Sequence, residues 1–275
     1  MPFIKSSESN SEPVNIYYED LGKGRPIVFI HGWPLSGSMW EYQIIPLTAR
    51  GFRCITYDRR GFGNSDRPLN GYDYDTMAGD LKALMDELKL EDVMLVGFSM
   101  GGGEIAKYFT HYGNAHVSKV VLVSCVTPSM LKTPDNPEGV PQEQFEQMAE
   151  AMKEDRPGFM QDFNKTFYGV SLVNHPVSDA FLQNALTKVM DSSPIATLEC
   201  AKAFAFTDFR NDMVNINVPT LVIQGDADKI VPIKATGEQS AKLIKDSRLI
   251  VYEGAPHGLW FTEKEKLTQD LIDFA

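Results

Sequence analysis

The segment 97–101, with the sequence GFSMG, constrains the fold of this chain more than any other stretch. It follows an apolar run at 93–96 and leads into a helix-forming segment, so it predicts a sharp turn from a buried strand into a helix. Gly97 and Gly101 leave room for such a turn because neither carries a side chain that would crowd it. Ser99 would then present its hydroxyl clear of the backbone, which is the arrangement of a nucleophile elbow.

Nearly continuous apolar runs, rather than runs that alternate apolar and polar residues, recur along the chain. Such runs are typical of strands buried on both faces of a parallel sheet. They lie at 27–30, 54–57, 93–96, 120–123, 221–223 and 249–252. Between two of them, residues 74–89 carry apolar side chains at helical spacing, which predicts a helix packed on the sheet. This alternation predicts an α/β fold with a mostly parallel central sheet and helices on both faces.

The segment 128–215 breaks this alternation. It is rich in Met and Phe, is interrupted by prolines and carries no convincing buried-strand run. It therefore predicts a helical cap inserted between two strands, which leaves residues 1–127 and 216–275 as the core of a single domain. Farther along the chain, Thr262 and Glu265 match a capping box ahead of apolar residues at helical spacing, so they predict a closing helix.

The charge and composition of the chain argue against its membership in several classes of protein. The 275 residues carry a formal net charge of -11, which disfavours a nucleic-acid partner because that binding depends on basic side chains. The first 14 residues lack the features of a secretory signal and no apolar run approaches membrane-spanning length, so we expect a cytoplasmic protein without a membrane partner. Cys54, Cys125 and Cys200 are widely spaced and odd in number, so we expect buried thiols rather than disulfides or a zinc site.

A nucleophilic serine needs a base, and the base needs an acid that orients it. The C-terminal third offers both at the ends of predicted strands, where open parallel sheets place catalytic groups. His257 follows the run 249–252, and two aspartates, Asp226 and Asp228, follow the run 221–223. Asp226 comes directly after a glycine and also suits a turn residue. The residues alone leave the choice between the two aspartates nearly even.

Five segments together resemble the α/β-hydrolase fold family, in its branch of cofactor-free haloperoxidases, aryl esterases and perhydrolases. They are HGWP at 31–34, YDRRGFG at 57–63, GFSMGGG at 97–103, GDAD at 225–228 and APHG at 255–258. The resemblance spans essentially the whole chain and implies the α/β-hydrolase fold with an inserted helical cap. It also implies a catalytic triad in the chain order Ser, Asp, His, with Ser99 as nucleophile, Asp228 as orienting acid and His257 as base.

The resemblance further implies an oxyanion hole and an apolar substrate pocket. The backbone N–H groups of Trp33 and Met100 would bind the oxygen that becomes negative during acyl transfer. Pro34 would stiffen the loop that presents the Trp33 carbonyl, an arrangement associated in perhydrolase-like members with the use of hydrogen peroxide. The residues implied to contact the substrate are Phe98, Phe163, Phe167, Ile230 and Val231. An apolar pocket favours small or aromatic neutral esters over charged ones.

The expected function is hydrolysis of small or aromatic carboxylic esters through an acyl-enzyme, with a secondary perhydrolase activity and no metal, haem, flavin or other cofactor. Related enzymes that hydrolyse lactams or carbon–carbon bonds keep the serine and remain alternatives, as does a noncatalytic ligand receptor, because a fold alone does not establish activity. Dehalogenases and epoxide hydrolases carry an aspartate at the elbow, so Ser99 argues against both of these classes of enzyme. The expected partner is a small-molecule acyl substrate, and the resemblance leaves assembly into a homo-oligomer open.

Overall fold

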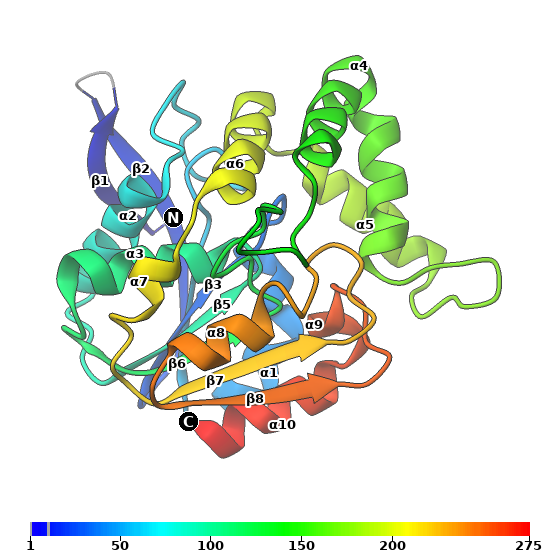
Figure 1. The fold of residues 1–275 in the computed structure, drawn as a ribbon. Helices are drawn as coiled ribbons and strands as arrows, with labels where there is room; N and C mark the ends of the chain where they lie inside the picture. The colour runs from blue at the N-terminus through cyan, green and yellow to red at the C-terminus, as the bar shows by residue number, and fades with distance from the viewer. Residues whose placement is uncertain (1, 10–11) are drawn as a thin grey trace.

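The computed structural model describes residues 2–9 and 12–275 of the chain. Its strands are β1 (Phe3–Ser9), β2 (Glu12–Gly22), β3 (Pro26–Ile30), β4 (Arg53–Tyr57), β5 (Val93–Phe98), β6 (Val117–Val123), β7 (Thr220–Gly225) and β8 (Ser247–Tyr252). Across the described residues they form one eight-stranded sheet in the order β1-β2-β4-β3-β5-β6-β7-β8 (Figure 1). Strands β3 to β8 are parallel to one another, whereas β2 pairs antiparallel with both β1 and β4.

All six apolar runs of the sequence lie in strands, from β3 to β8, which confirms the mostly parallel α/β sheet. The apolar runs do not predict β1 and β2. In β2, buried Val14 and Ile16 alternate with more exposed residues, so this strand buries only one of its faces over that stretch. A strand of that kind lacks the continuous apolar run by which the others are recognised.

Helices cover both faces of the sheet. On one face α1 (Glu41–Ala49) packs against α10 (Lys264–Phe274), and on the other lie α2 (Tyr74–Glu87), α3 (Gly101–Tyr112) and α8 (Gly237–Leu243) (Figure 1). The helix predicted for residues 74–89 is α2, and it begins where the side chain of Asp73 accepts the backbone N–H of Thr76 at 2.8 Å. A short helix, η1 (Gly37–Trp40), precedes α1.

The closing helix forms, but the predicted capping box is wrong. Thr262 is the last residue of a separate short helix, α9 (Leu259–Thr262), and α10 begins two residues later, after Glu263. A residue inside a helix does not have the extended backbone from which a threonine caps the next helix. The apolar positions Leu267 and Leu271 of α10 are fully buried.

Four helices, α4 (Gln142–Phe167), α5 (Asp179–Met190), α6 (Pro194–Phe206) and α7 (Arg210–Met213), separate β6 from β7. α4 packs against α5 and α6, and the three lie together above the sheet at the top of Figure 1. α4 bends at Asp155, whose backbone is not helical, and the Asp155 carboxylate accepts the N–H of Gly158 at 3.0 Å, so it caps the second half of α4. The limits of the predicted cap, 128–215, stay a prediction.

The three cysteines, Cys54, Cys125 and Cys200, are unbonded to one another and buried, as their number and spacing predict. Burial raises the pKa of the Cys54 and Cys200 thiols to about 12, so both stay protonated at neutral pH and neither supplies a thiolate nucleophile. In the part of the chain that the structure describes, no helix combines the length and the apolar character needed to cross a membrane.

Candidate active site

Ser99 occupies the turn between β5 and α3. Its φ of 52° is a left-handed conformation that residues other than glycine rarely adopt. The Ser99 N–H donates to the carbonyl of Val123 at 2.9 Å, which ties the turn to the end of β6. A Cβ at Gly101 would lie 2.8 Å from the carbonyl oxygen of Ile30, so β3 and α3 approach this closely only with glycine there. The segment thus forms the sharp turn that its sequence predicts.

A chain of hydrogen bonds joins Ser99 to His257 and His257 to Asp228. His257 Nε2 lies 3.0 Å from Ser99 Oγ, and His257 Nδ1 lies 2.7 Å from Asp228 Oδ2. All three residues are buried, and they follow β5, β8 and β7, so the ends of three parallel strands bring them together. With the Nδ1 proton donated to the carboxylate, Nε2 is free to accept the proton of the Ser99 hydroxyl.

The two aspartates of the β7 loop differ in what they contact. Asp226 lies away from the imidazole hydrogen bond: its Oδ1 accepts the N–H of Gly254 at 2.6 Å, which holds the loop that leads to His257. Asp228 Oδ1 accepts the N–H groups of Ile230 and Val231 at 2.9 and 2.8 Å, while Oδ2 faces His257. The geometry therefore places Asp228, and not Asp226, beside the imidazole.

Two aromatic rings enclose the imidazole of His257. The ring centroid of Phe98 lies 4.9 Å from that of His257, and the ring of Phe167 meets it edge-on at 4.8 Å. The carbonyl of Phe167 also accepts the N–H of Gly258 at 2.8 Å, so the end of α4 contacts the histidine loop directly. Neither Phe98 nor Phe167 is among the residues that line the cavity at Ser99, so contact of either ring with a substrate stays a prediction.

A cavity of about 140 Å³, here called the chamber, opens at Ser99 and His257. Its walls include Trp33 and three of the residues implied to contact the substrate, Phe163, Ile230 and Val231. Further residues that the sequence does not single out as site residues also line it. These are Val126, Met130, Val140, Gln144, Phe145, Met148, Phe204 and Lys229. Most of the lining is apolar, and its polar side chains besides Ser99 and His257 are Gln144 and Lys229.

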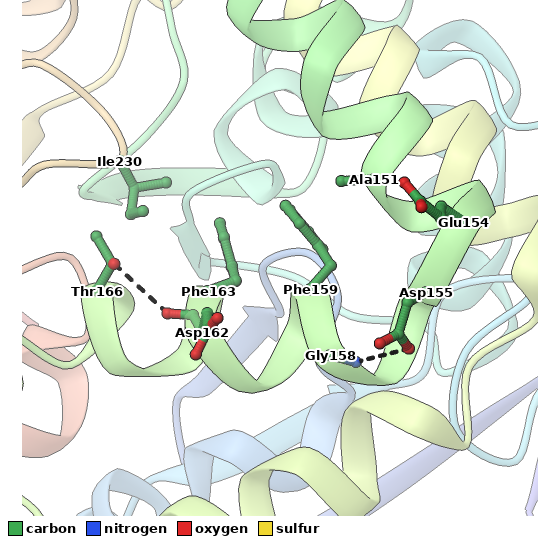
Figure 2. Close-up of a pocket in the computed structure, with 9 residues that line it drawn as sticks. All are labelled: Ala151, Glu154, Asp155, Gly158, Phe159, Asp162, Phe163, Thr166 and Ile230. Atoms are coloured by element: carbon green, nitrogen blue, oxygen red, sulfur yellow. Dashed lines mark hydrogen bonds between the residues drawn. The ribbon is translucent and has the colours of Figure 1, made fainter.

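A larger hollow of about 520 Å³ runs along α4, outside the chamber (Figure 2). Phe163 and Ile230 line both cavities and therefore lie at the boundary between them. Figure 2 shows the rings of Phe159 and Phe163 extending from α4 toward the side on which Ile230 lies, with the bend at Asp155 at the far end of the hollow. A group too large for the chamber would have to pass Phe163 and Ile230 to reach this hollow.

The backbone amides of Trp33 and Met100 lie in the loop after β3 and directly after Ser99. Among the described residues, no backbone carbonyl or side chain accepts either N–H. The indole of Trp33 is held by its own hydrogen bond, from Nε1 to the carbonyl of Thr197 in α6 at 2.9 Å. Two such N–H donors without an acceptor, one of them directly after Ser99, are suited to bind an oxygen that carries negative charge.

A buried network fixes the loop that carries Trp33 against the helix that follows Ser99. Burial lowers the pKa of His31, so its imidazole is neutral, with Nδ1 donating to the Gly32 carbonyl at 2.9 Å and Nε2 accepting the Arg59 N–H at 2.9 Å. The Arg59 guanidinium donates to the His31 carbonyl at 2.7 Å and to Glu104 of α3 at 2.6 Å. Both charged side chains are fully buried. This network explains Arg59 structurally, without a contact to substrate.

Replacing Arg59 with methionine is expected to lower the free energy of unfolding by about 3–5 kcal/mol, because the Glu104 carboxylate would stay buried without its partner. Burial already raises the pKa of Glu104, and Arg59 opposes that shift. Urea denaturation of the single variant measures the loss. The double variant Arg59→Met/Glu104→Leu removes both charges and should recover most of it. A single variant as stable as the parent would show that the pair does not hold this region together.

A family model described as the alpha/beta hydrolase fold matches residues 25–264. The chain is 42% identical to a non-heme haloperoxidase of Rhodococcus erythropolis over 275 residues, which covers 100% of this chain and 99% of the relative. It is 37% identical to a bifunctional esterase/perhydrolase of Acinetobacter calcoaceticus, with 97% and 98% covered. A solved bromoperoxidase structure from Bacillus anthracis superposes with a TM-score of 0.95 at 42% identity, covering 99% of this chain and 98% of that one. The chain therefore belongs to the α/β-hydrolase fold family, with full-length relatives among the non-heme haloperoxidases and the esterase/perhydrolases.

Proposed function

We propose that this enzyme is a serine hydrolase that cleaves small or aromatic carboxylic esters through an acyl-enzyme. One observation carries the proposal: Ser99, His257 and Asp228 form a continuous hydrogen-bonded chain whose serine end opens into a small apolar chamber. A neutral acyl group fits such a mostly apolar lining. The esterase/perhydrolase relative supports the same class of reaction.

In the first step, His257 Nε2 takes the proton of the Ser99 hydroxyl as Oγ attacks the ester carbonyl carbon. Asp228 holds the Nδ1 proton and stabilises the imidazolium that forms. The amides of Trp33 and Met100 donate to the carbonyl oxygen as it becomes negative, and loss of one such donor costs about 3 kcal/mol in typical cases. Protonation of the alcohol oxygen by His257 then releases the alcohol and leaves the acyl group on Ser99.

In the second step, His257 takes a proton from water as the water oxygen attacks the acyl carbon. The bond from the acyl carbon to Ser99 Oγ then breaks, His257 returns the proton to Oγ, and a carboxylic acid is released. Hydrogen peroxide attacks in the same way and releases a peroxycarboxylic acid. We propose this perhydrolysis as a secondary activity, on the basis of the haloperoxidase and perhydrolase relatives. In that case halide would be oxidised by the free peracid in solution.

The purified enzyme, without added metal or cofactor, is expected to hydrolyse p-nitrophenyl acetate and butyrate. The chamber of about 140 Å³ should disfavour p-nitrophenyl laurate, whose acyl chain must extend past Phe163 and Ile230. Addition of hydrogen peroxide and bromide to an ester assay should produce bromination of an added acceptor that depends on the ester. A bicyclic lactam serves as the competing substrate. Turnover of the lactam without turnover of any ester would replace the proposal with the amide-hydrolase alternative.

A further inference from the structure

Gln224 is a fully buried side chain near the end of β7, four residues before Asp228. Its Nε2 donates to the carbonyl of Val231 at 2.8 Å and to Thr236 Oγ1 at 3.1 Å. A buried amide without hydrogen-bond partners lowers the free energy of unfolding. The groups that it bonds to therefore indicate which part of the structure it holds in place. Here one partner is the backbone of the loop that carries Asp228.

Val231 connects Gln224 to the carboxylate of Asp228. The Val231 N–H donates to Asp228 Oδ1 at 2.8 Å, and the carbonyl of the same residue accepts the Gln224 amide at 2.8 Å. The second donor to Oδ1 is the N–H of Ile230, at 2.9 Å. The positions of both N–H groups that hold Oδ1 therefore depend on where the backbone of Val231 is fixed.

The Gln224 amide is also closely surrounded on the side that faces the start of α8. Thr236, just before α8, is fully buried, and its hydroxyl donates to the carbonyl of Pro232 at 2.8 Å. At Gly237 a Cβ would lie 2.3 Å from Gln224 Oε1, so this position has no room for a side chain. The amide thus has one orientation available to it, between the loop and the start of α8.

We infer that Gln224 is a positioning residue, which acts through Val231 to aim Asp228 at His257. With Oδ1 held by two amides of a fixed loop, Oδ2 is left 2.7 Å from His257 Nδ1. Without the Gln224 amide the loop loses its anchor to β7, and the carboxylate loses its fixed direction. The inference rests on the proposed function, since it assigns Gln224 a role only through the Asp228–His257 hydrogen bond.

Gln224→Met keeps the length of the side chain and removes its hydrogen bonds. We expect kcat for p-nitrophenyl acetate to fall by about 10- to 100-fold, because small displacements of catalytic groups cost rates of this size. KM should change by less than about threefold, because Gln224 is not among the residues that line the chamber. Thr236→Val should lower kcat in the same direction, and Thr236→Ser, which keeps the hydroxyl, should restore it.

Gln43→Met is the matched control for loss of a buried glutamine. Its Nε2 donates to the Trp260 carbonyl at 2.8 Å, and within the described residues it makes no hydrogen bond to the Asp228 loop. We expect this variant to keep kcat within about threefold even where the thermal midpoint falls. If Gln224→Met fails to fold, the comparison of Thr236→Val with Thr236→Ser tests the same claim in its place.

The deciding readout is the effect of Gln224→Met in an Asp228→Ala background. If Gln224 acts through Asp228, the second change should alter the residual kcat by less than about twofold, because residues that act as a unit are not additive. A full additional loss would show a general structural role and overturn the inference. An Asp228→Ala variant that keeps the parent kcat would instead contradict the proposed function itself.

Discussion

Ser99→Ala is expected to lower kcat/KM for p-nitrophenyl acetate by roughly 10⁴-fold or more. Alanine removes the hydroxyl that attacks the carbonyl in the proposed mechanism, while the two amides of the proposed oxyanion hole remain. The residual rate should therefore still exceed that of the ester in water. Steady-state kinetics measures the loss, and retention of the thermal midpoint shows that the fold is intact.

Ser124→Ala is the matched control for this change. Ser124 is also buried, follows the neighbouring strand β6 and has a positive φ of 46°, and its hydroxyl makes no hydrogen bond to the described residues. It should keep kcat/KM within about threefold, because it loses a hydroxyl that has no described role. An equal loss in both variants would mean that the Ser99 effect arises from disturbance of the strand ends and not from loss of the nucleophile.

Asp228→Asn is expected to lower kcat by about 10³- to 10⁴-fold. The N–H groups of Ile230 and Val231 require an oxygen in place of Oδ1, so the new amide nitrogen would face His257. That nitrogen is a donor, and it would force the His257 Nδ1 to accept. The imidazole would then carry its proton on Nε2, where it could no longer accept the proton of Ser99.

Asp226→Asn tests the competing aspartate with the same chemical change. Asparagine keeps an oxygen that can accept the N–H of Gly254, so kcat should stay within about threefold. The pH of the assay should be held constant for both variants. The reverse pattern, with activity lost in Asp226→Asn and kept in Asp228→Asn, would assign the orienting role to Asp226.

The ends of the strands could be located from the sequence because continuous apolar runs mark buried strands and the polar motifs follow them directly. Ser99, His257 and the pair Asp226/Asp228 all follow such runs. The choice between the two aspartates could not be made from residue type alone. It depends on which carboxylate meets the imidazole and which one accepts the Gly254 amide, and that is a matter of loop geometry.

The residues that line the chamber are harder to predict from the sequence. Phe145, Met148 and Phe204 recur at positions that equally suit packing of α4 and α6 on their neighbours, and periodicity does not separate the two uses. Phe167 shows the opposite case, because its ring encloses the imidazole and does not line the chamber. Gln224 carries no signal in the sequence beyond being a polar residue at the end of an apolar run, which is typical of a strand end.

Reaction of the enzyme with a fluorophosphonate, followed by intact-mass and peptide mass spectrometry, tests the central claim most directly. We expect one phosphonyl group per chain, located on Ser99, with p-nitrophenyl acetate turnover lost in proportion to labelling and no adduct in Ser99→Ala. An enzyme that turns over the ester while Ser99 stays unlabelled, or that carries the adduct on another residue, would contradict the claim.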